Sequence, residues 1–517
     1  MKKLMVFLVV IALSLGVASG CMRDSVPTAT PTQIEPTATQ TVATSTNTST
    51  PTSSRTQTPT DTPTATATPT ATPSPSPTCT LTASLTFTPE PAFLILQAGD
   101  RLPKVRLRPR DAREIEDNYI GTDLGSYDPG YHNSSVVYPI GFKWIRISFN
   151  TDPLNWQRVE REPGQYSIDP AVDRRVTEYA SDGINILLNL GVGDWVNRLD
   201  VTRFRDEAEV ERYANFVRFM VRHFKDRVQY YEIWNEPGDI PVANYAKVVR
   251  RVVPVIREEY PGAKIVIGAI PGKWEFGYPG YGESGRYTLF IDYLKDLLMS
   301  GVAPMADVVS WHPLYGNRPD DPYYQSYPAM VEEIKELAKS QGFQGEFLVE
   351  EIVWRTAGDP SDLQIQRVTE LVATKYFLRS IVTHRGMDLI VTVAIPGAHD
   401  PALQKVRAIH NVNDLLAGAK PLNMPIEIHN GAANIKSYAF TVGGDSLIAL
   451  WTDGVAVDND PGAKCTLSVP GFSAQKVMGI DILNGFEQQM ITSTEGKNLI
   501  IHDLLIKDYP IILRLTK

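Results

Sequence analysis

Eight short apolar runs that alternate with amphipathic segments past residue 110 place the strongest constraint on the fold of this chain. Each run has the length and residue types of a buried strand, and each amphipathic segment has the period of a helix. The predicted strands are 118–122, 143–149, 184–190, 228–234, 264–270, 307–312, 346–352 and 388–394, and the predicted helices are 170–181, 207–225, 242–259, 287–300, 327–341, 362–384 and 403–416. This alternation predicts an α/β fold, a (β/α)₈ TIM barrel. A doubly wound open sheet is the alternative, but no Gly-rich phosphate fingerprint follows an early strand.

The rhythm changes near residue 424. From 424 to 517 apolar and polar side chains alternate, and Gly, Asn and Asp separate the runs. Such alternation predicts antiparallel strands, so we expect a barrel domain over 92–423 and a small all-β sandwich domain over 424–517. The segment 92–107 either adds a strand to this sandwich or closes the bottom of the barrel.

The N-terminus has the layout of an export signal. Residues 1–3 include two lysines, an apolar run follows at 4–17, and small residues lead to Cys21. This order is typical of a cleaved signal, and the cysteine resembles the lipidated cysteine of bacterial lipoproteins. We therefore expect residues 1–20 to be removed as a signal peptide and Cys21 to carry the lipid; a plain secretory signal is the alternative. The apolar run is too short for a membrane-spanning helix, which needs about 20 residues.

Residues 22–91 are nearly all Thr, Pro, Ser and Ala. A segment with so few apolar side chains cannot form a core, so we expect a disordered stalk between the anchor and the folded part. The expected location is extracytoplasmic, with the protein held at the bacterial cell membrane by its lipid alone. If the signal is a plain secretory one, the protein is secreted.

Composition argues against several partners and cofactors. The 517 residues carry a formal net charge of −9 and no long basic block, which argues against a nucleic-acid partner. Only three cysteines occur, so no disulfide framework is implied, and the eight histidines lack the spacing of a zinc site. We expect no metal and no cofactor. The sequence gives no indication of the oligomeric state.

Two of the predicted strands end in carboxylic acids. The fourth run is followed by Glu236, and the seventh contains Glu350 and Glu351. In a (β/α)₈ barrel the carboxyl ends of the strands hold the catalytic groups. Hydrolysis of a glycosidic bond needs two carboxyls with different pKa values. One protonates the departing oxygen, and the other attacks the anomeric carbon or activates water.

Asn235-Glu236-Pro237 after the fourth strand and Glu351 in the seventh resemble the catalytic pair of the retaining clan A glycoside hydrolases. The architecture is most similar to that of the β-xylosidase and α-L-iduronidase family. The resemblance implies that Glu236 is the acid/base and Glu351 the nucleophile of a double displacement at a β-glycosidic bond. Residues 349–354 resemble the clan's Val-Thr-Glu-Phe-Gly-Trp, which favours Glu351 over its rival Glu350. Because side chains alternate along a strand, we expect only one of these two to point into the barrel.

The resemblance also implies substrate-binding residues. Asn235 would donate to the sugar 2-hydroxyl, or it caps a turn instead. Arg146 would support the nucleophile or form a structural ion pair, and His312 is either functional or a core histidine. Exposed rings near the barrel mouth could stack on sugar rings. The expected substrate-binding set is Asn235, Arg146, His312, Tyr315, Trp354, Trp195 and Trp274.

Two departures from the clan pattern leave the substrate open. Residues 391–396 lack the Trp that the clan has after strand eight, and Tyr315 stands three residues after His312 where two is commoner. The leading hypothesis is an exported glycosidase that acts on an oligo- or polysaccharide. The alternatives are a non-catalytic carbohydrate-binding or adhesion protein on a degenerate barrel, and a transglycosylase that uses the same residues. The sugar, the linkage and endo or exo action stay open.

Overall fold

The computed structural model describes residues 96–97, 104–124, 137–147, 154–191, 203–357, 365–395, 402–429, 431 and 433–517. The chain divides into two units, Met1–Leu85 and Thr86–Lys517, and every described residue lies in the second. The expected signal peptide, Cys21 and the stalk therefore lie outside the described residues. Within the described part, no helix combines the length and the apolar character needed to cross a membrane.

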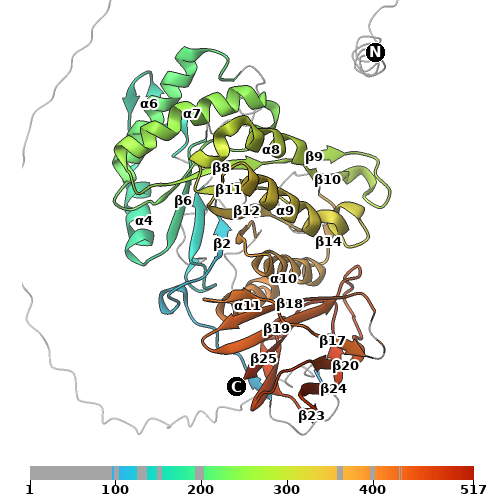
Figure 1. The fold of residues 1–517 in the computed structure, drawn as a ribbon. Coiled ribbons are helices and arrows are strands. Elements are labelled where there is room, and N and C mark those ends of the chain that lie inside the picture. The colour runs from blue at the N-terminus through green and yellow to red at the C-terminus, as the bar shows by residue number, and fades with distance from the viewer. Residues whose placement is uncertain are drawn as a thin grey trace, which may run out of the picture. The chain divides into compact units, whose positions relative to one another are not determined.

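Eight parallel strands close into a barrel in the order in which they occur along the chain (Figure 1). They are β2 (Ile120–Asp123), β3 (Trp144–Ile147), β6 (Asn185–Asn189), β7 (Tyr230–Glu232), β8 (Lys264–Ile270), β11 (Val308–Trp311), β12 (Glu346–Ile352) and β15 (Ile390–Val393). Each overlaps one predicted run, and the expected (β/α)₈ barrel is confirmed. The strands are buried on both faces, which is why they are almost continuously apolar in sequence.

The barrel interior is layered. Its lower layer is apolar and consists of Trp144, Leu187, Tyr230, Val266, Val308, Leu348 and Ile390. The upper layer, two residues further along each strand, consists of Arg146, Asn189, Glu232, Gly268, Ser310, Glu350 and Thr392. Residues two apart on a strand face the same side, so this polar layer lies on the apolar one. The polar layer therefore lies inside the barrel just below the carboxyl ends of the strands.

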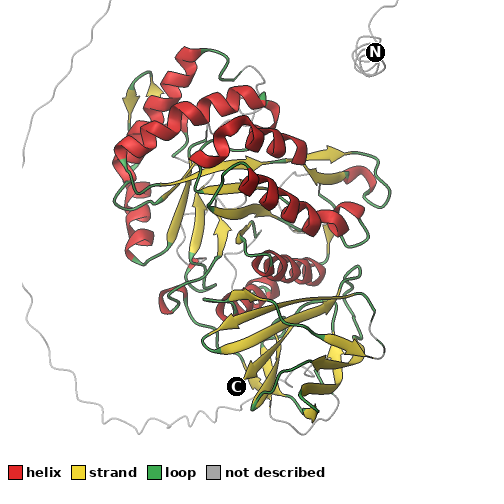
Figure 2. Ribbon diagram, in the orientation of Figure 1, coloured by secondary structure: helices red, strands yellow, loops and turns green. Residues whose placement is uncertain are grey.

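Helices surround the barrel strands (Figure 2). They are α3 (Trp156–Val159), α4 (Pro170–Ser181), α6 (Glu207–Phe224), α7 (Val242–Glu259), α8 (Ile291–Leu297), α9 (Pro322–Ser340), α10 (Glu370–Gly386) and α11 (Gln404–Leu415). Helices α9 and α10 begin at other residues than the predicted 327 and 362, because a capping side chain fixes the first turn of each. Asp321 caps α9 at the Tyr323 amide, and Thr369 caps α10 at the Val372 amide.

A hairpin replaces the start of one predicted helix. The helix predicted from 287 begins only at Ile291, because Arg286–Leu289 forms strand β10 and pairs with β9 (Gly272–Glu275). The hairpin follows β8 directly, at the carboxyl end of the barrel. Two further short pairs are β4 (Glu160–Glu162) with β5 (Gln165–Tyr166), and β13 (Arg355–Thr356) with β14 (Arg367–Val368).

An all-β sandwich follows the barrel, as expected. One sheet holds β1 (Lys104–Arg106), β22 (Phe486–Gln489), β21 (Lys476–Asp481), β25 (Ile511–Thr516), β19 (Asp445–Thr452), β18 (Ile435–Val442) and β16 (Lys420–Leu422). The other holds β17 (Glu427–His429), β20 (Ala463–Val469), β24 (Asn498–Ile506) and β23 (Ser493–Glu495). Because β1 pairs with β22, the segment before the barrel adds a strand to the sandwich.

Helix α10 lies between the barrel and the larger sheet (Figure 1), and every residue from Val372 to Arg385 is buried. Lys375 Nζ lies 2.7 Å from Asp508 Oδ1 in the sandwich. Arg379 donates hydrogen bonds to the carbonyls of Thr452, Gly454 and Asp508. The helix therefore belongs to the core of both domains.

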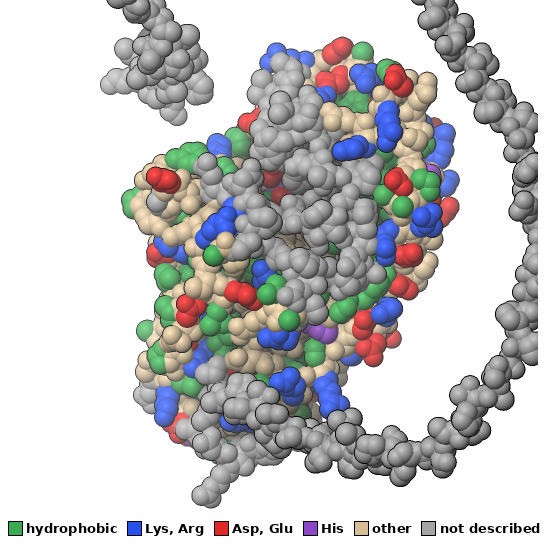
Figure 3. Space-filling model, turned by 180° about the vertical axis from the view of Figure 1, so that it is seen from behind, with side chains coloured by type: hydrophobic (Ala, Val, Ile, Leu, Met, Phe, Trp, Pro, Cys, Tyr) green, Lys and Arg blue, Asp and Glu red, His purple; other side chains and the backbone are tan. Residues whose placement is uncertain are grey.

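Several charged side chains on the surface form ion pairs. On α6, Arg218 and Arg222 each lie 2.7 Å from Glu259 on α7. Figure 3 shows acidic and basic side chains interspersed over the face seen from behind. Such exposed pairs contribute little to stability, about 0–1 kcal/mol each. The buried ion pairs of the barrel differ from them in this respect.

Candidate active site

Glu236 leaves its barrel strand on a strained turn. Both Trp234 and Glu236 are left-handed, with φ of 69° and 49°. Residues other than glycine adopt this region only where the surroundings enforce it, commonly at functional sites. The Trp234 indole is buried edge-on against Phe204 and Tyr213, and its carbonyl accepts a 2.8 Å hydrogen bond from Asn189. This packing fixes the turn that aims Glu236 at the centre of the barrel mouth.

The end of β12 is irregular as well. Glu351 has φ 48°, and the register with β15 shifts between Val349 and Ile352. In a regular strand Glu350 would face inward and Glu351 outward, but the left-handed residue turns Glu351 inward too. The expectation that only one of the two can point into the barrel is therefore wrong. Both are buried, and both contact Arg146.

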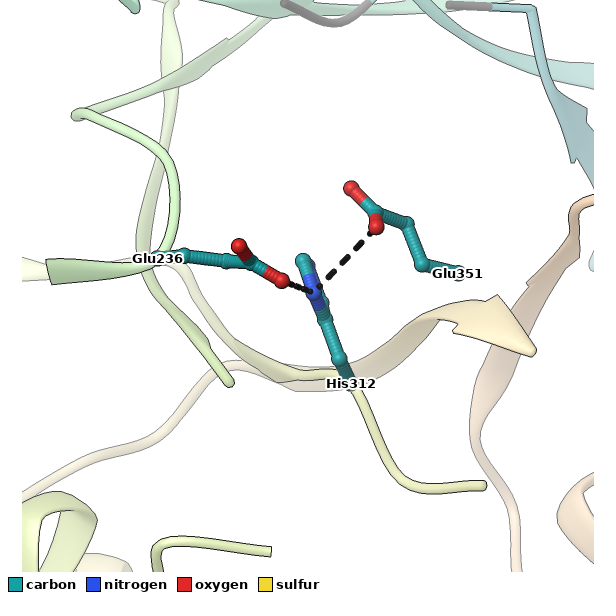
Figure 4. A group of neighbouring side chains, drawn as sticks. All are labelled: Glu236, His312 and Glu351. Atoms are coloured by element: carbon teal, nitrogen blue, oxygen red, sulfur yellow. Dashed lines mark hydrogen bonds and ion pairs between the residues drawn. The ribbon is translucent and has the colours of Figure 1, made fainter. Parts of the chain in front are cut away.

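Glu236, His312 and Glu351 meet at the centre of the site, where the imidazole lies between the two carboxyls (Figure 4). Nδ1 of His312 lies 2.8 Å from Oε1 of Glu236 and 3.6 Å from Oε2 of Glu351. One oxygen of each carboxyl and one imidazole nitrogen lie within 4.8 Å of one another. By distance the three could also ligate a metal ion, the one such group in the part of the chain that the structure describes. The two carboxyls are close enough to act on the same bond.

Two donors hold the Glu351 carboxyl. The Tyr315 hydroxyl donates a 2.6 Å hydrogen bond to Oε2, and Nη1 of Arg146 donates a 2.7 Å hydrogen bond to Oε1. Burial raises the pKa of Glu351, and the charge of Glu236 adds to this, while His312 and Arg146 oppose it. The carboxyls of Glu236 and Glu351 are close enough to titrate together, so their apparent pKa values belong to the pair and not to either residue alone.

Arg146 is the electrostatic centre of the site. Its fully buried guanidinium lies 2.6 Å from Asp123, 2.9 Å from Glu232, 2.6 Å from Glu350 and 2.7 Å from Glu351. Nη2 also donates a 2.6 Å hydrogen bond to Oδ1 of Asn235. The two expected roles of Arg146 therefore coincide, because the buried ion pairs also hold Glu351 and Asn235. Among the described residues, the buried Nδ2 of Asn235 has no hydrogen-bond partner, so it can donate to a ligand.

His312 is fully buried among three carboxyls. Burial lowers the pKa of its imidazole, but Glu351, Glu236 and Glu350 outweigh that effect and raise the pKa to about 10. An imidazolium carries a proton on each nitrogen, and in that form Nδ1 donates to Glu236. The histidine is thus part of the site rather than a neutral core residue.

The expected tryptophans separate in the structure. Trp274 on β9 is half-buried and packs edge-on against Tyr287, with ring centroids 5.3 Å apart. Tyr287 in turn lies 4.4 Å from Tyr315, so this wall leads to Glu351. Trp195 lies outside the described residues.

Trp354 does not fit the expected role of a sugar platform. Its ring is buried between Tyr376 and Phe377 of α10, and its indole N–H donates a 3.0 Å hydrogen bond to the Asn317 carbonyl. The irregularity at Glu351 changes the side to which the following side chains point, and the Trp354 side chain points outward into the helix layer. It is a core residue.

The sequence reading missed three polar residues of the site. Asp123 ends β2 and pairs with Arg146, and Glu232 and Asn189 belong to the polar layer. Glu232 accepts a 2.7 Å hydrogen bond from Asn189. The available signal for Glu232 and Asn189 was positional, because each polar-layer residue stands two places after an apolar residue of the lower layer.

Solved structures of glycoside hydrolases are similar to this chain in fold. A family 39 glycoside hydrolase from the gut symbiont Bacteroides cellulosilyticus WH2 superposes with a TM-score of 0.55 at 18% identity, over 80% of this chain and 83% of that one. A family 30 subfamily 8 xylanase from Clostridium acetobutylicum gives 0.47 at 10% identity, over 80% and 98%, respectively. A family 51 arabinofuranosidase from Xanthomonas axonopodis pv. citri gives 0.46 at 13%, over 79% and 97%. The first of these shows a shared fold. No protein-family model and no curated protein matches the sequence.

Proposed function

We propose that the protein is a retaining glycosidase that cleaves β-glycosidic bonds by double displacement. The observation that carries the proposal is the approach of Glu236 and Glu351, since one carboxylate oxygen of each lies within 4.8 Å of the other. Retaining enzymes hold their carboxyls about 5–5.5 Å apart, whereas inverting enzymes leave about 6.5–9.5 Å for a water molecule. The spacing therefore supports retention.

In the first step Glu236 donates its proton to the glycosidic oxygen as an oxygen of Glu351 bonds to the anomeric carbon and the leaving group departs. In the second step Glu236 takes a proton from water, whose oxygen displaces Glu351 from that carbon. Tyr315 and Arg146 stabilise the Glu351 carboxylate before attack and when it is released. Nδ2 of Asn235 is available to donate to the sugar 2-hydroxyl.

The substrate is a β-linked oligo- or polysaccharide. Trp274 on the β9–β10 hairpin offers a partly exposed ring that can stack on a sugar. The Glu351 carboxylate and the buried carboxyls of the polar layer beneath it suit a transition state that develops positive charge at the anomeric carbon.

For its location, we propose that the mature protein begins at Cys21 and is tethered outside the cell by the lipid on this residue. The layout of residues 1–20 and the Thr/Pro-rich segment 22–91 supports this. Replacing Cys21 with Ala should move the protein from the membrane fraction to the soluble fraction. A variant that stays in the membrane fraction would refute lipid anchoring.

The test of activity is turnover of a panel of aryl β-glycosides, with the anomer first released observed by proton NMR. We expect the β-anomer to appear first and to mutarotate later. The Glu351→Ala variant should release no product. Binding without turnover by the unaltered protein would favour the non-catalytic alternative, and an α-anomer as first product would indicate inversion.

A further inference from the structure

The barrel contains a second pair of carboxyls, Glu232 and Glu350, in the polar layer below the proposed catalytic pair. Both are fully buried. At the position of Glu350 the clan motif has Thr, so the resemblance assigns this residue no role. A buried carboxyl is costly unless it is paired, and its presence here calls for a function.

Glu350 contacts both cations of the site. Its Oε2 lies 2.6 Å from Nε of Arg146 and 3.6 Å from Nε2 of His312, the latter an ion pair too long for a hydrogen bond. Glu232 meets the guanidinium at the same Nε, which donates a 2.9 Å hydrogen bond to it, and Asn189 donates a second hydrogen bond of 2.7 Å. Glu350 and Glu351 therefore both contact Arg146 and His312, Glu351 on the Nδ1 side of the imidazole and Glu350 on the Nε2 side.

Charge balance requires protons in this cluster. Arg146 and His312 face five carboxyls, namely Asp123, Glu232, Glu236, Glu350 and Glu351. Burial and the neighbouring charge of Glu350 raise the pKa of Glu232 well above its ordinary value. Burial also acts on Glu350, but Arg146 and His312 outweigh it and lower the pKa of that carboxyl. By these directions Glu232 is the member of the lower pair that favours its proton, and Glu350 is the member whose charge the two cations favour.

We infer that Glu350 is a positioning residue that holds His312 as an imidazolium, anchored at Nε2, so that Nδ1 donates to Glu236. For its effect on catalysis this inference rests on the proposed glycosidase function. A neutral imidazole would carry only one proton, on either Nδ1 or Nε2. Among the described residues, no group other than Glu350 contacts Nε2 and could determine which nitrogen carries that proton. Glu350 thereby sets the proton affinity of Glu236 through His312.

The titratable and charged groups around His312 come from five elements or the loops that follow them. They are Glu236 after β7, Glu350 and Glu351 on β12, Arg146 on β3, Tyr287 on β10, and Tyr315 after β11. Burial raises the pKa of Tyr287 well above its ordinary value, so this phenol stays neutral. Arg146 is cationic and is balanced by its own carboxyl partners. The anions that face the imidazole are thus carboxyls, and Glu350 is the one at Nε2.

The direct test is the protonation state of His312 by imidazole ¹⁵N NMR, assigned from the signal lost in His312→Gln. In the unaltered protein both nitrogens should carry protons up to about pH 8, and a neutral ring at pH 7 would overturn the inference without any Glu350 variant. In Glu350→Gln the pKa of His312 should fall by about one to three pH units, the usual effect of losing a contacting opposite charge. An unchanged titration in a folded Glu350→Gln protein would also overturn it.

Two matched variants sharpen the test. Glu232→Gln imitates a carboxyl that already holds its proton, so the titration of His312 should not move, and a fall equal to that of Glu350→Gln would refute the placement of the proton. Glu346→Gln, at the opposite end of β12, controls for the loss of a carboxyl on the same strand.

The kinetic readout is separate. In Glu350→Gln the basic limb of the kcat/KM profile should move to higher pH, since Glu236 loses the adjacent cation, whereas Glu346→Gln should leave it in place. A basic limb that stays put in an active Glu350→Gln enzyme would overturn the inference. If the protein hydrolyses no glycoside but the NMR titration shifts as described, the positioning role stands and the proposed function fails.

Discussion

The Tyr315 hydroxyl donates a 2.6 Å hydrogen bond to Oε2 of Glu351, and the same ring packs on Tyr287. The bond stabilises the charged form of the carboxyl, while burial favours the neutral form. The ionisation of Glu351 at neutral pH therefore depends on donors placed by the loop after β11.

Replacing Tyr315 with Phe removes that donor and leaves the ring. The acidic limb of the kcat/KM profile should move to higher pH by about one to two pH units, since a hydrogen bond to a charged group contributes roughly 1.5–3 kcal/mol. Tyr323→Phe is the control, because its buried hydroxyl donates to the Pro313 carbonyl instead. If the acidic limb of the kcat/KM profile moves equally in both variants, the shift comes from a disturbed loop structure and not from the hydrogen bond to Glu351.

Variants of the two glutamates proposed as catalytic should fail in different ways. Glu351→Ala lacks the nucleophile and should abolish turnover of every substrate. Glu236→Ala should still form the glycosyl-enzyme from substrates with very good leaving groups and then stall, because the second step lacks its base. Azide should rescue this variant with a β-glycosyl azide, and any rescue of Glu351→Ala should give the α-anomer, as NMR of the products would reveal.

The adjacent carboxyl provides the counter-test. If Glu350→Ala abolishes activity while Glu351→Ala remains near the unaltered enzyme, Glu350 is the nucleophile and the roles assigned on β12 are reversed.

Arg146→Met should be among the most destabilising single changes in the barrel. It leaves several buried carboxyls without their cation, and breaking a buried ion pair costs about 3–5 kcal/mol. Denaturant unfolding would measure the loss. Arg218→Met is the comparison, since its partly exposed pairs with Glu258 and Glu259 should contribute no more than about 1 kcal/mol.

His312 should stabilise the fold in a pH-dependent manner. Its folded pKa, about 10, lies above its ordinary value, so the contribution is complete below the ordinary pKa and disappears as pH rises towards 10. The free energy of unfolding lost in His312→Gln should therefore be largest near pH 6 and shrink in alkali. A loss that grows from neutral to alkaline pH would contradict a charged His312.

A second buried histidine offers the opposite slope as a control. Burial lowers the pKa of His384 to about 3, so this residue favours the folded state above its ordinary pKa, and acid removes that contribution. The loss in His384→Gln should shrink as pH falls from about 7 to 4.

Replacing Trp274 and replacing Trp354 should have different effects, the first on KM and the second on the free energy of unfolding. Trp274→Ala should raise KM about tenfold with little change in stability, because roughly 1.4 kcal/mol of lost contact is a factor of ten. Trp354→Ala should instead lower the free energy of unfolding by about 3–5 kcal/mol, since it empties a core position beside α10. Kinetics and denaturant unfolding of both variants check this, and a KM effect confined to Trp354→Ala would reverse the assignment.

The barrel strands could be predicted because burial on both faces leaves an apolar run in the sequence. Helix starts were missed where a local side chain decides them, as Asp321 does for α9, or where a hairpin intervenes, as β10 does before α8. Both effects depend on contacts that no periodicity reports.

Glu236 could be located because Asn-Glu-Pro follows a strand directly. Alternation failed at Glu351, since it assumes a regular strand and a single left-handed residue there brings two consecutive carboxyls to one side. The partnership of Glu232 with Glu350 joins strands that are not neighbours in the barrel, so only closure of the sheet brings the two together.

Helix α10 limits how this protein can be rearranged. Its buried residues contact the barrel on one side and the sandwich on the other, and a single hydrophobic cluster runs through both. Cutting the chain after residue 423 would uncover apolar side chains together with Lys375 and Arg379, whose partners lie in the sandwich. The sandwich is thus no exchangeable module: grafting this barrel onto another scaffold requires carrying the sandwich with it or redesigning the helix, and heating should melt both together in one transition.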